Sequence, residues 1–181
     1  MIIAFTLFRN ILIAVLLYCI KMQEAYETLI TSVRREIERL KWKVRYVPHE
    51  IIENYNACYR VVYKGEIIYP PAADKLKIPL NGIWISERLK EYEEYVLFHE
   101  LKEILYRYQG YDVIEAHIRA RIDEALRFCN DTKWVKYYRE FPDSIVPLEC
   151  LKIICKTLKT NDLKNIKNLY RKIMKCVNTS V

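Results

Sequence analysis

The chain has 181 residues, 52% hydrophobic and 29% charged, a composition that excludes a disordered protein and provides for at least one buried core. Six cysteines without a C-x-x-C pair argue against a zinc ribbon or a compact disulfide scaffold and favour buried or free thiols in a reducing compartment. The net charge of +7 belongs to the C-terminal part, because residues 1–150 carry 22 basic and 22 acidic side chains, whereas residues 151–181 carry eight basic side chains against Asp162 alone.

Residues 1–21 are apolar apart from Thr6, Arg9, Asn10 and the final lysine. The length fits a membrane-spanning helix, but a charge near its middle would cost about 2.5–3.5 kcal/mol on insertion. The segment also fits a signal peptide, although no small-residue cleavage site follows it. A translation start at Met22 and a helix packed against the fold are two further interpretations. A membrane contact through residues 1–20 stays open, and so does the choice between a cytoplasmic and a membrane-anchored location.

The next segments predict a helix followed by short strands. Apolar residues recur at helical spacing from Gln23 to Lys43. The stretch ACYRVVYKGEIIYPP is rich in β-branched and aromatic residues around Lys64–Gly65, which predicts a β-hairpin. Asn81–Gly82 predicts a second turn, after which Ile83–Ile85 form a short strand.

A helical hairpin is predicted after these strands. Apolar residues spaced three and four apart predict a long helix over about residues 86–109, and Gly110 ends it. Asp112, followed by Glu115 three residues later, gives a capping-box-like start to another helix that extends to about residue 129.

Two more helices are predicted at the C-terminus, in VPLECLKIICKTLK and DLKNIKNLYRKIMKCV, with lysines opposite the apolar face. Such a basic pair predicts an acidic partner, nucleic acid or anionic lipid bound through residues 151–181, or else a packed appendage with a solvated lysine face. The whole pattern predicts an α+β fold. We expect a hydrophobic leader (1–21), a domain with an N-terminal helix, a small mostly antiparallel sheet and the hairpin (22–142), and a basic helical tail (143–181). Three glycines with many Ile, Lys and Glu favour a heat-adapted source.

The hairpin carries two of the three histidines of the chain. His99 and Glu103 are four residues apart and share a helix face, while Glu100 is rotated away from His99 by about 100°. If the helices fold back at Gly110, residue 117 comes level with residue 104, so His117 lies opposite Glu103.

This is the H-E-x-x-H arrangement of zinc hydrolases with glutamate in place of the second histidine. Zinc binds two imidazoles and a carboxylate in catalytic sites, so His99, Glu103 and His117 are the predicted ligands. Glu124 is an outer or alternative ligand, and Glu100 is the predicted general base. The alternative interpretation is a solvated helix face in which His117 pairs with a backbone group or a carboxylate.

The segment GIWISERLKEYEEYVLFHELKEIL resembles the entry to minimal zincin-like metallopeptidases, in which a short edge strand precedes the H-E helix. The longer pattern, H-E-x-x-E, then A-H-x-x-A and a glutamate seven residues after the histidine, resembles a set of otherwise uncharacterised archaeal and phage proteins. The resemblance covers about residues 81–126 and implies a zincin-like core with bound zinc. It also implies a peptide or protein substrate paired with the edge strand, here Ile83, Trp84 and Ile85. The matching positions are His99, Glu100, Glu103, Ala116, His117, Ala120 and Glu124.

The prediction from these residues is a zinc-dependent hydrolase, most simply a metallopeptidase, in which Glu100 accepts a proton from water activated by the metal. Tyr92, Tyr95 and Arg121 are candidates to stabilise the oxyanion, and the sequence does not choose among them. One rival is a non-catalytic module of the same fold, metal-stabilised or metal-free. The other is a nucleic-acid-binding or membrane-binding regulator that acts through the tail.

Overall fold

The computed structural model describes residues 33–52, 55–159 and 166–180. The chain divides into two compact units, residues 1–36 and 37–181, and the fold described below is that of the second. The predicted leader and residues 23–32 of the helix predicted over Gln23–Lys43 lie outside the described residues. Of the rest of that helix, residues 33–39 are helical. Within the described part, no helix combines the length and apolar character that a membrane crossing needs.

Four short strands form one mixed sheet: β1 (Lys43–Val47), β2 (Ala57–Tyr63), β3 (Glu66–Ile68) and β4 (Gly82–Ser86). Their order across the sheet is β1-β4-β2-β3. β2 pairs antiparallel with both β3 and β4, whereas β1 pairs parallel with β4. The predicted hairpin is confirmed, because Lys64 and Gly65 form a two-residue turn between β2 and β3 with positive φ angles of 49° and 88°.

The prediction that Ile83–Ile85 form an edge strand is wrong, because β4 lies inside the sheet with β1 on one side and β2 on the other. The backbone groups expected to bind a substrate are therefore used in the sheet. Ile83 and Ile85 are fully buried. Trp84 points to the opposite face, where it packs against a small cluster. The buried members of that cluster are Val47, Ile52, Cys58, Ala73 and Ile78.

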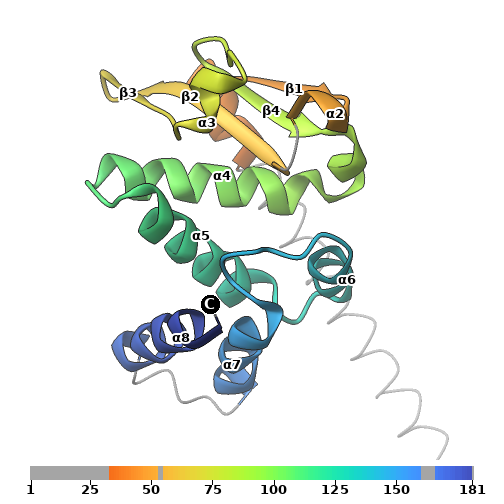
Figure 1. The fold of residues 1–181 in the computed structure, drawn as a ribbon, viewed down its shortest axis with the longest axis vertical. Coiled ribbons are helices and arrows are strands. Elements are labelled where there is room, and N and C mark those ends of the chain that lie inside the picture. Colours follow the sequence, from red (N-terminus) through yellow and green to blue (C-terminus); the bar gives the residue numbers. More distant parts are fainter. Residues whose placement is uncertain (1–32, 53–54, 160–165, 181) are drawn as a thin grey trace, which may run out of the picture. The chain divides into compact units, whose positions relative to one another are not determined.

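The helical hairpin is confirmed and covers one face of the sheet (Figure 1). A 3₁₀ turn, η1 (Glu87–Tyr92), leads into α4 (Glu93–Tyr108), which lies across the strands, and α5 (Val113–Phe128) packs beneath α4. Gly110 ends the first helix with a φ of +92°, a conformation open to glycine. Asp112 caps α5, because its Oδ1 accepts the backbone N–H of Glu115 at 2.8 Å.

Small residues let the two helices approach closely. Ala116 and Ala120 on α5 are fully buried, as expected for the face that meets α4. Tyr59 and Tyr63 of β2 point toward α4 from the sheet, since Tyr59 bonds Glu103 and the ring of Tyr63 lies 5.0 Å from that of Tyr108. The sheet, α4 and α5 therefore stack as three layers. The buried charged residues of α4 lie between the sheet and α5.

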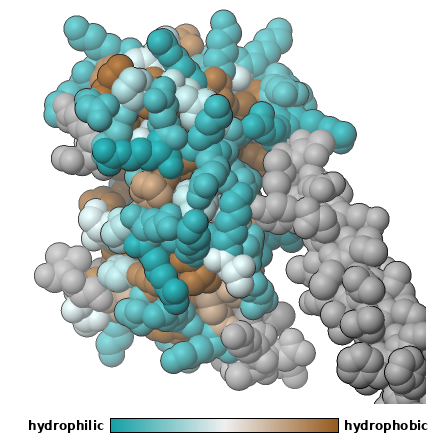
Figure 2. Space-filling view, turned by 90° about the vertical axis from the view of Figure 1, so that its right-hand side faces the viewer, coloured by the Kyte–Doolittle hydropathy of each residue, from teal (hydrophilic) through white to brown (hydrophobic). Residues whose placement is uncertain are grey.

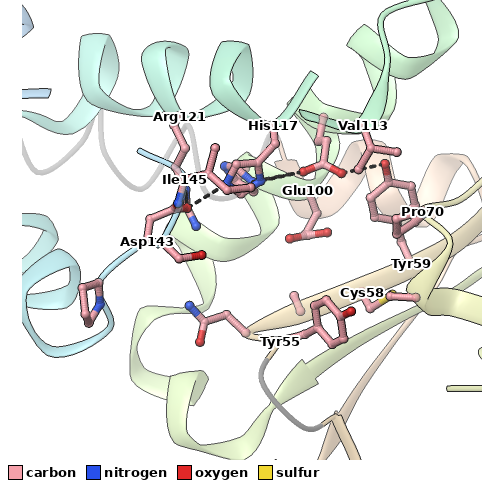
Figure 3. A pocket seen from close by; sticks show the side chains of 17 residues that line it. Tyr55, Cys58, Tyr59, Pro70, Glu100, Val113, His117, Arg121, Asp143 and Ile145 are labelled. Carbon is pink, nitrogen blue, oxygen red and sulfur yellow. Dashed lines mark hydrogen bonds and ion pairs between the residues drawn. The ribbon is translucent and has the colours of Figure 1, made fainter. Parts of the chain in front are cut away.

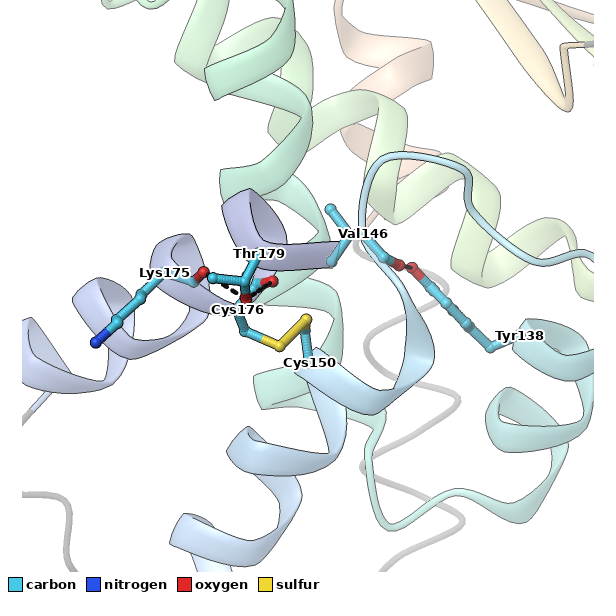
Figure 4. Close-up of a disulfide and its surroundings, with 6 residues drawn as sticks. All are labelled: Tyr138, Val146, Cys150, Lys175, Cys176 and Thr179. Atoms are coloured by element: carbon cyan, nitrogen blue, oxygen red, sulfur yellow. Dashed lines mark hydrogen bonds between the residues drawn. A yellow bond between two sulfur atoms is a disulfide. The ribbon is translucent and has the colours of Figure 1, made fainter. Parts of the chain in front are cut away.

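Three helices follow the hairpin: α6 (Thr132–Glu140), α7 (Leu148–Lys159) and α8 (Ile166–Ser180). The two predicted tail helices are present, and α7 packs on α5. Figure 4 shows a disulfide between Cys150 of α7 and Cys176 of α8, so the expectation of free thiols is wrong for this pair. The periodicity along each helix gave no indication of which cysteines would meet across them. The short helices α2 (His49–Ile52) and α3 (Ala72–Lys75) complete the fold.

The surface of this unit is mostly hydrophilic on the face in Figure 2, with hydrophobic side chains in smaller areas between the charged ones. The connection from α6 to α7, residues 141–147, is held at its end because Tyr138 donates a hydrogen bond of 2.6 Å to the carbonyl of Val146. This connection brings a further acidic residue to the helical hairpin.

Candidate metal centre

Two helices supply the polar residues at the centre of the fold. α4 contributes His99, Glu100 and Glu103, and α5 contributes His117. The first three are buried, with 2%, 7% and 6% of their surface exposed, and His117 is partly buried. Helical spacing places His99 and Glu103 one turn apart, and the fold-back at Gly110 brings His117 against both.

Three donor atoms converge between the helices. His117 Nδ1 lies 3.1 Å from His99 Nε2 and 3.0 Å from Glu103 Oε2, and His99 Nε2 lies 3.4 Å from the same carboxylate oxygen. Ligands bound tetrahedrally to zinc at 2.0–2.1 Å are separated by about 3.3 Å. The three separations are close to that value, so His99, Glu103 and His117 form a group that could hold a metal ion.

The other nitrogen of each imidazole faces a carboxylate. His117 Nε2 lies 2.7 Å from Asp143 Oδ2, and His99 Nδ1 lies 3.2 Å from Glu124 Oε2. The second contact is close enough for an ion pair but lacks the angle of a hydrogen bond. Carboxylates in these positions fix the ring orientation of metal-binding histidines and favour the tautomer whose lone pair faces the metal.

Asp143 contacts the cluster but was not predicted from the sequence. It comes from the connection between α6 and α7, where its Oδ1 accepts the backbone N–H groups of Ile145 and Val146 at 2.8 Å each. Its Oδ2 bonds both His117 and Arg121 Nε, the latter at 2.8 Å (Figure 3). A Pro-Asp-Ser turn is a local signal for the backbone bonds, but nothing local predicts the contact with His117.

Glu124 is fully buried beside His99 and is held by two donors. Arg121 Nη1 donates to its Oε2 at 2.6 Å, and Trp134 Nε1 donates to its Oε1 at 2.6 Å. The carboxylate lies on the Nδ1 side of His99, away from the Nε2 atom that belongs to the three-atom group. Glu124 therefore contacts His99 on the side opposite the three-atom group.

Burial and neighbouring charges shift the pKa values of these groups in different directions. Burial raises the pKa of Glu100 to about 7, helped by the charge of Glu103. Burial would also raise the pKa of Glu103, but its bonds to His117 and His99 hold that pKa below the usual range. For His117, burial lowers the pKa, while the bonds to Asp143 and Glu103 outweigh it and raise the pKa to about 9.

A cavity of about 360 Å³ opens onto the cluster. Glu100 points into it, and no hydrogen bond joins its carboxylate to another described residue (Figure 3). The cavity lies between α4, the start of α5, the start of β2 and the 141–147 connection. Its side chains include Tyr55, Cys58, Tyr59, Pro70, Val113, Arg121, Asp143 and Ile145 as well as the central cluster.

Two of the three residues predicted as candidates to stabilise an oxyanion lie away from the cavity. Tyr92 donates to Glu140 at 2.7 Å and Tyr95 to Asp131 at 2.6 Å, and neither tyrosine lines the cavity. Arg121 does line it. Tyr59, which sequence reasoning did not single out, reaches the cluster by donating to Glu103 Oε1 at 3.0 Å.

Comparison with known proteins adds no relative: no protein-family model, no curated protein and no solved structure matches this chain. The functional argument therefore depends on the geometry of the site itself.

Proposed function

We propose that this protein is a zinc-dependent hydrolase, with a peptide or similar amide as substrate. The observation that carries the proposal is the convergence of His99 Nε2, His117 Nδ1 and Glu103 Oε2, each pair within 3.0–3.4 Å, beside a buried glutamate that lines an open cavity. Two imidazoles and one glutamate are a ligand set of catalytic zinc, which leaves further coordination positions for water and substrate.

The charges of the surrounding residues support a cation at this point. Four carboxylates and one guanidinium lie at the site, so three negative charges are in excess when all four carboxylates are ionised and both imidazoles are neutral. A divalent cation would offset two of these charges. Two protons on the imidazoles are the metal-free alternative, in which His117 donates to both Asp143 and Glu103. The groups counted are Glu100, Glu103, Glu124, Asp143 and Arg121.

With a neutral His117, the tautomer that Asp143 selects is the one that a metal ion needs. Asp143 accepts the proton on Nε2 of a neutral His117, which leaves a lone pair on Nδ1. That lone pair points at the Glu103 oxygen and at His99 Nε2, two further lone-pair donors. Three such atoms at 3.0–3.4 Å repel one another unless a proton or a metal ion lies among them.

Each residue then has a defined part in hydrolysis. Zinc held in this way supplies Lewis acidity, which lowers the pKa of water and polarises a carbonyl group. Glu100, next to the ligands and open to the cavity, accepts a proton from the attacking water and returns it to the leaving amine. Asp143 and Glu124 hold the two imidazoles in place, and Tyr59 holds Glu103.

A peptide substrate also finds backbone groups beside the cavity. Among the described strands, β3 pairs with β2 only at Val61–Tyr63. Pro70 and Pro71 follow β3 and cannot donate to an extended ladder, so the same edge of β2 at Ala57–Tyr59, which lines the cavity, has no strand beside it. A strand of substrate can add there by main-chain hydrogen bonds. This edge replaces β4 as the proposed pairing edge.

Metal content and one substitution test the proposal. Purified protein, incubated with zinc and desalted, should contain about one zinc per chain, and His117→Ala should contain little. Glu100→Gln should retain zinc and lose at least about a hundredfold in hydrolysis of a peptide library, since general-base catalysis contributes 10²–10⁴-fold. Glu94→Gln, a matched change on the same helix outside the cavity, should retain both zinc and activity.

Two results would contradict the proposal. Absence of bound zinc and of any other divalent metal would leave the metal-free hydrogen-bonded cluster. One zinc per chain with no hydrolysis of any peptide would favour the non-catalytic metal-stabilised module. The predicted contact of residues 151–181 with an acidic partner or nucleic acid stays a prediction, tested separately by salt-dependent binding.

A further inference from the structure

Apolar side chains line the cavity on either side of the polar central cluster. In Figure 3, Ile145 lies on one side of Glu100 near Asp143, while Val113 and Pro70 lie on the other side, and Tyr55 lies below. These apolar side chains are only partly buried, and Tyr55 has 41% of its surface exposed. A bound molecule that crosses the cavity past Glu100 therefore meets apolar surface on both sides of the reacting position.

Apart from Glu100, the charged residues that line the cavity are already paired. Arg121, the one lysine or arginine among the described lining residues, donates its Nε–H to Asp143 and its Nη1–H to Glu124 and is 5% exposed. Asp143 is bound by His117, Arg121 and two backbone N–H groups. Glu103 is bound by Tyr59 and His117. Each of these charges has its partner within the fold.

The net charge of the site also disfavours a substrate with an anionic group. With zinc in place and Glu100 ionised as the proposed base, the four carboxylates, one guanidinium and one divalent cation leave one negative charge in excess. A carboxylate or phosphate group of a substrate would enter against that charge, without a free cation on the described lining to receive it. A substrate bound by its C-terminal carboxylate or through a phosphate does not fit such a lining.

We infer that the cavity selects an uncharged peptide segment with apolar side chains on both sides of the scissile bond, so that cleavage is internal and not at a chain end. The inference rests on the proposed function, because it describes the substrate of the same site. Apolar side chains gain by burial against Ile145 on one side and Val113 on the other, while a charged side chain or chain end loses solvation without an ionic partner.

Three matched peptides test this selection. They are acetylated and amidated, have one sequence, and carry Leu, Gln or Glu on both sides of a central bond, so that Gln separates the effect of polarity from that of charge. With zinc-loaded full-length protein, kcat/KM should fall in the order Leu, Gln, Glu, with at least about tenfold between Leu and Glu. Equal or faster cleavage of the Glu peptide would overturn the inference, and loss of that cleavage in Glu100→Gln would show that the proposed function still holds.

A substitution in the wall gives a second readout. Ile145→Lys places a cation in the cavity and should raise kcat/KM for the Glu peptide relative to the Leu peptide. Ile114→Lys is the matched control, because Ile114 is 60% exposed and does not line the cavity, and it should leave the ratio unchanged. A ratio that is equally unchanged in Ile145→Lys would place substrate side chains elsewhere and overturn the inference.

The inference is also testable if no peptide is cleaved, an outcome that contradicts the proposed function. Fluorescence anisotropy of the three labelled peptides with zinc-loaded Glu100→Gln measures binding alone. Tightest binding of the Leu peptide supports apolar selection by the cavity. Binding of none of them, or equal binding of all three, overturns the inference as well.

Discussion

The bond between Asp143 and His117 provides the sharpest test of the metal centre. In Asp143→Asn, the amide oxygen can still accept the backbone N–H groups of Ile145 and Val146, which the Oδ1 of Asp143 now accepts. The amide NH₂ then takes the place of Oδ2 and faces two N–H donors, His117 Nε2 and Arg121 Nε, at 2.7 and 2.8 Å. The donor–donor contact at His117 disappears when the imidazole proton moves from Nε2 to Nδ1. Nδ1 is the atom that should bind the metal.

The expected magnitude follows from the role of such outer carboxylates. Loss of a partner that orients a metal-binding histidine costs about 10- to 100-fold in metal affinity, which is about 1.4–2.7 kcal/mol. Because the wrong tautomer blocks the ligand atom outright, we expect the upper part of this range. Asp143→Ala, which removes the carboxylate without imposing a tautomer, should weaken zinc less than Asp143→Asn does.

The assay is competition for zinc between the protein and a chromophoric chelator, with far-UV circular dichroism to verify the fold. Glu149→Gln is the control, because Glu149 is an exposed carboxylate at the start of α7 whose described partner is Lys152. It should leave the zinc Kd unchanged. A folded Asp143→Asn protein whose zinc Kd stays within twofold of the parent would refute the role given to Asp143 and weaken the assignment of His117 as a ligand.

Three further predictions concern stability. Chelation of zinc should lower Tm by about 5–10 °C, because zinc at a hundredfold excess over Kd contributes about 2.7 kcal/mol, and His99→Ala should show no such shift in a zinc titration followed by calorimetry. Trp134→Phe removes the 2.6 Å bond to the buried Glu124 and should cost about 1.5–3 kcal/mol in urea unfolding; a change below 0.5 kcal/mol would contradict the importance of that bond. Loss of the Cys150–Cys176 disulfide, by Cys176→Ala, should cost about 3 kcal/mol, since the bond closes a loop of 26 residues, and reducing agent should destabilise the parent but not the variant.

The helical hairpin was predictable because its signals are local. Gly110 and the Asp112–Glu115 pair mark the end of one helix and the start of the next within six residues, and the structure uses both. Once the turn is located, helix geometry alone brings His117 to the level of Glu103. The convergence of the three donor atoms needed no knowledge of the rest of the fold.

The position of β4 was not predictable in the same way. Whether a strand lies at the edge of a sheet depends on which strand pairs with its second side, and for β4 that partner is β1. Only Val47 in β1 is fully buried, so its sequence gives weak evidence of a strand. The register pairs Lys43 with Gly82 across an intervening hairpin and two short helices, so this contact is non-local. The substrate edge was therefore assigned to the wrong strand.

The carboxylates that contact the two histidines show the same contrast between local signals, which the sequence reveals, and non-local contacts, which it does not. Glu124 follows His117 by two turns of α5, so its level in the hairpin was predictable from the sequence. Its bonds to Arg121 and Trp134, which occupy both of its oxygens, were not. Asp143 has no such relation to His117, because α6 and a connection lie between them. The hairpin supplies the donor atoms, but the tautomer of His117 depends on a residue just before the tail helices. A chain that ended at residue 142 would keep His99, Glu103 and His117 and should bind zinc more weakly than the full chain, for the same reason as Asp143→Ala.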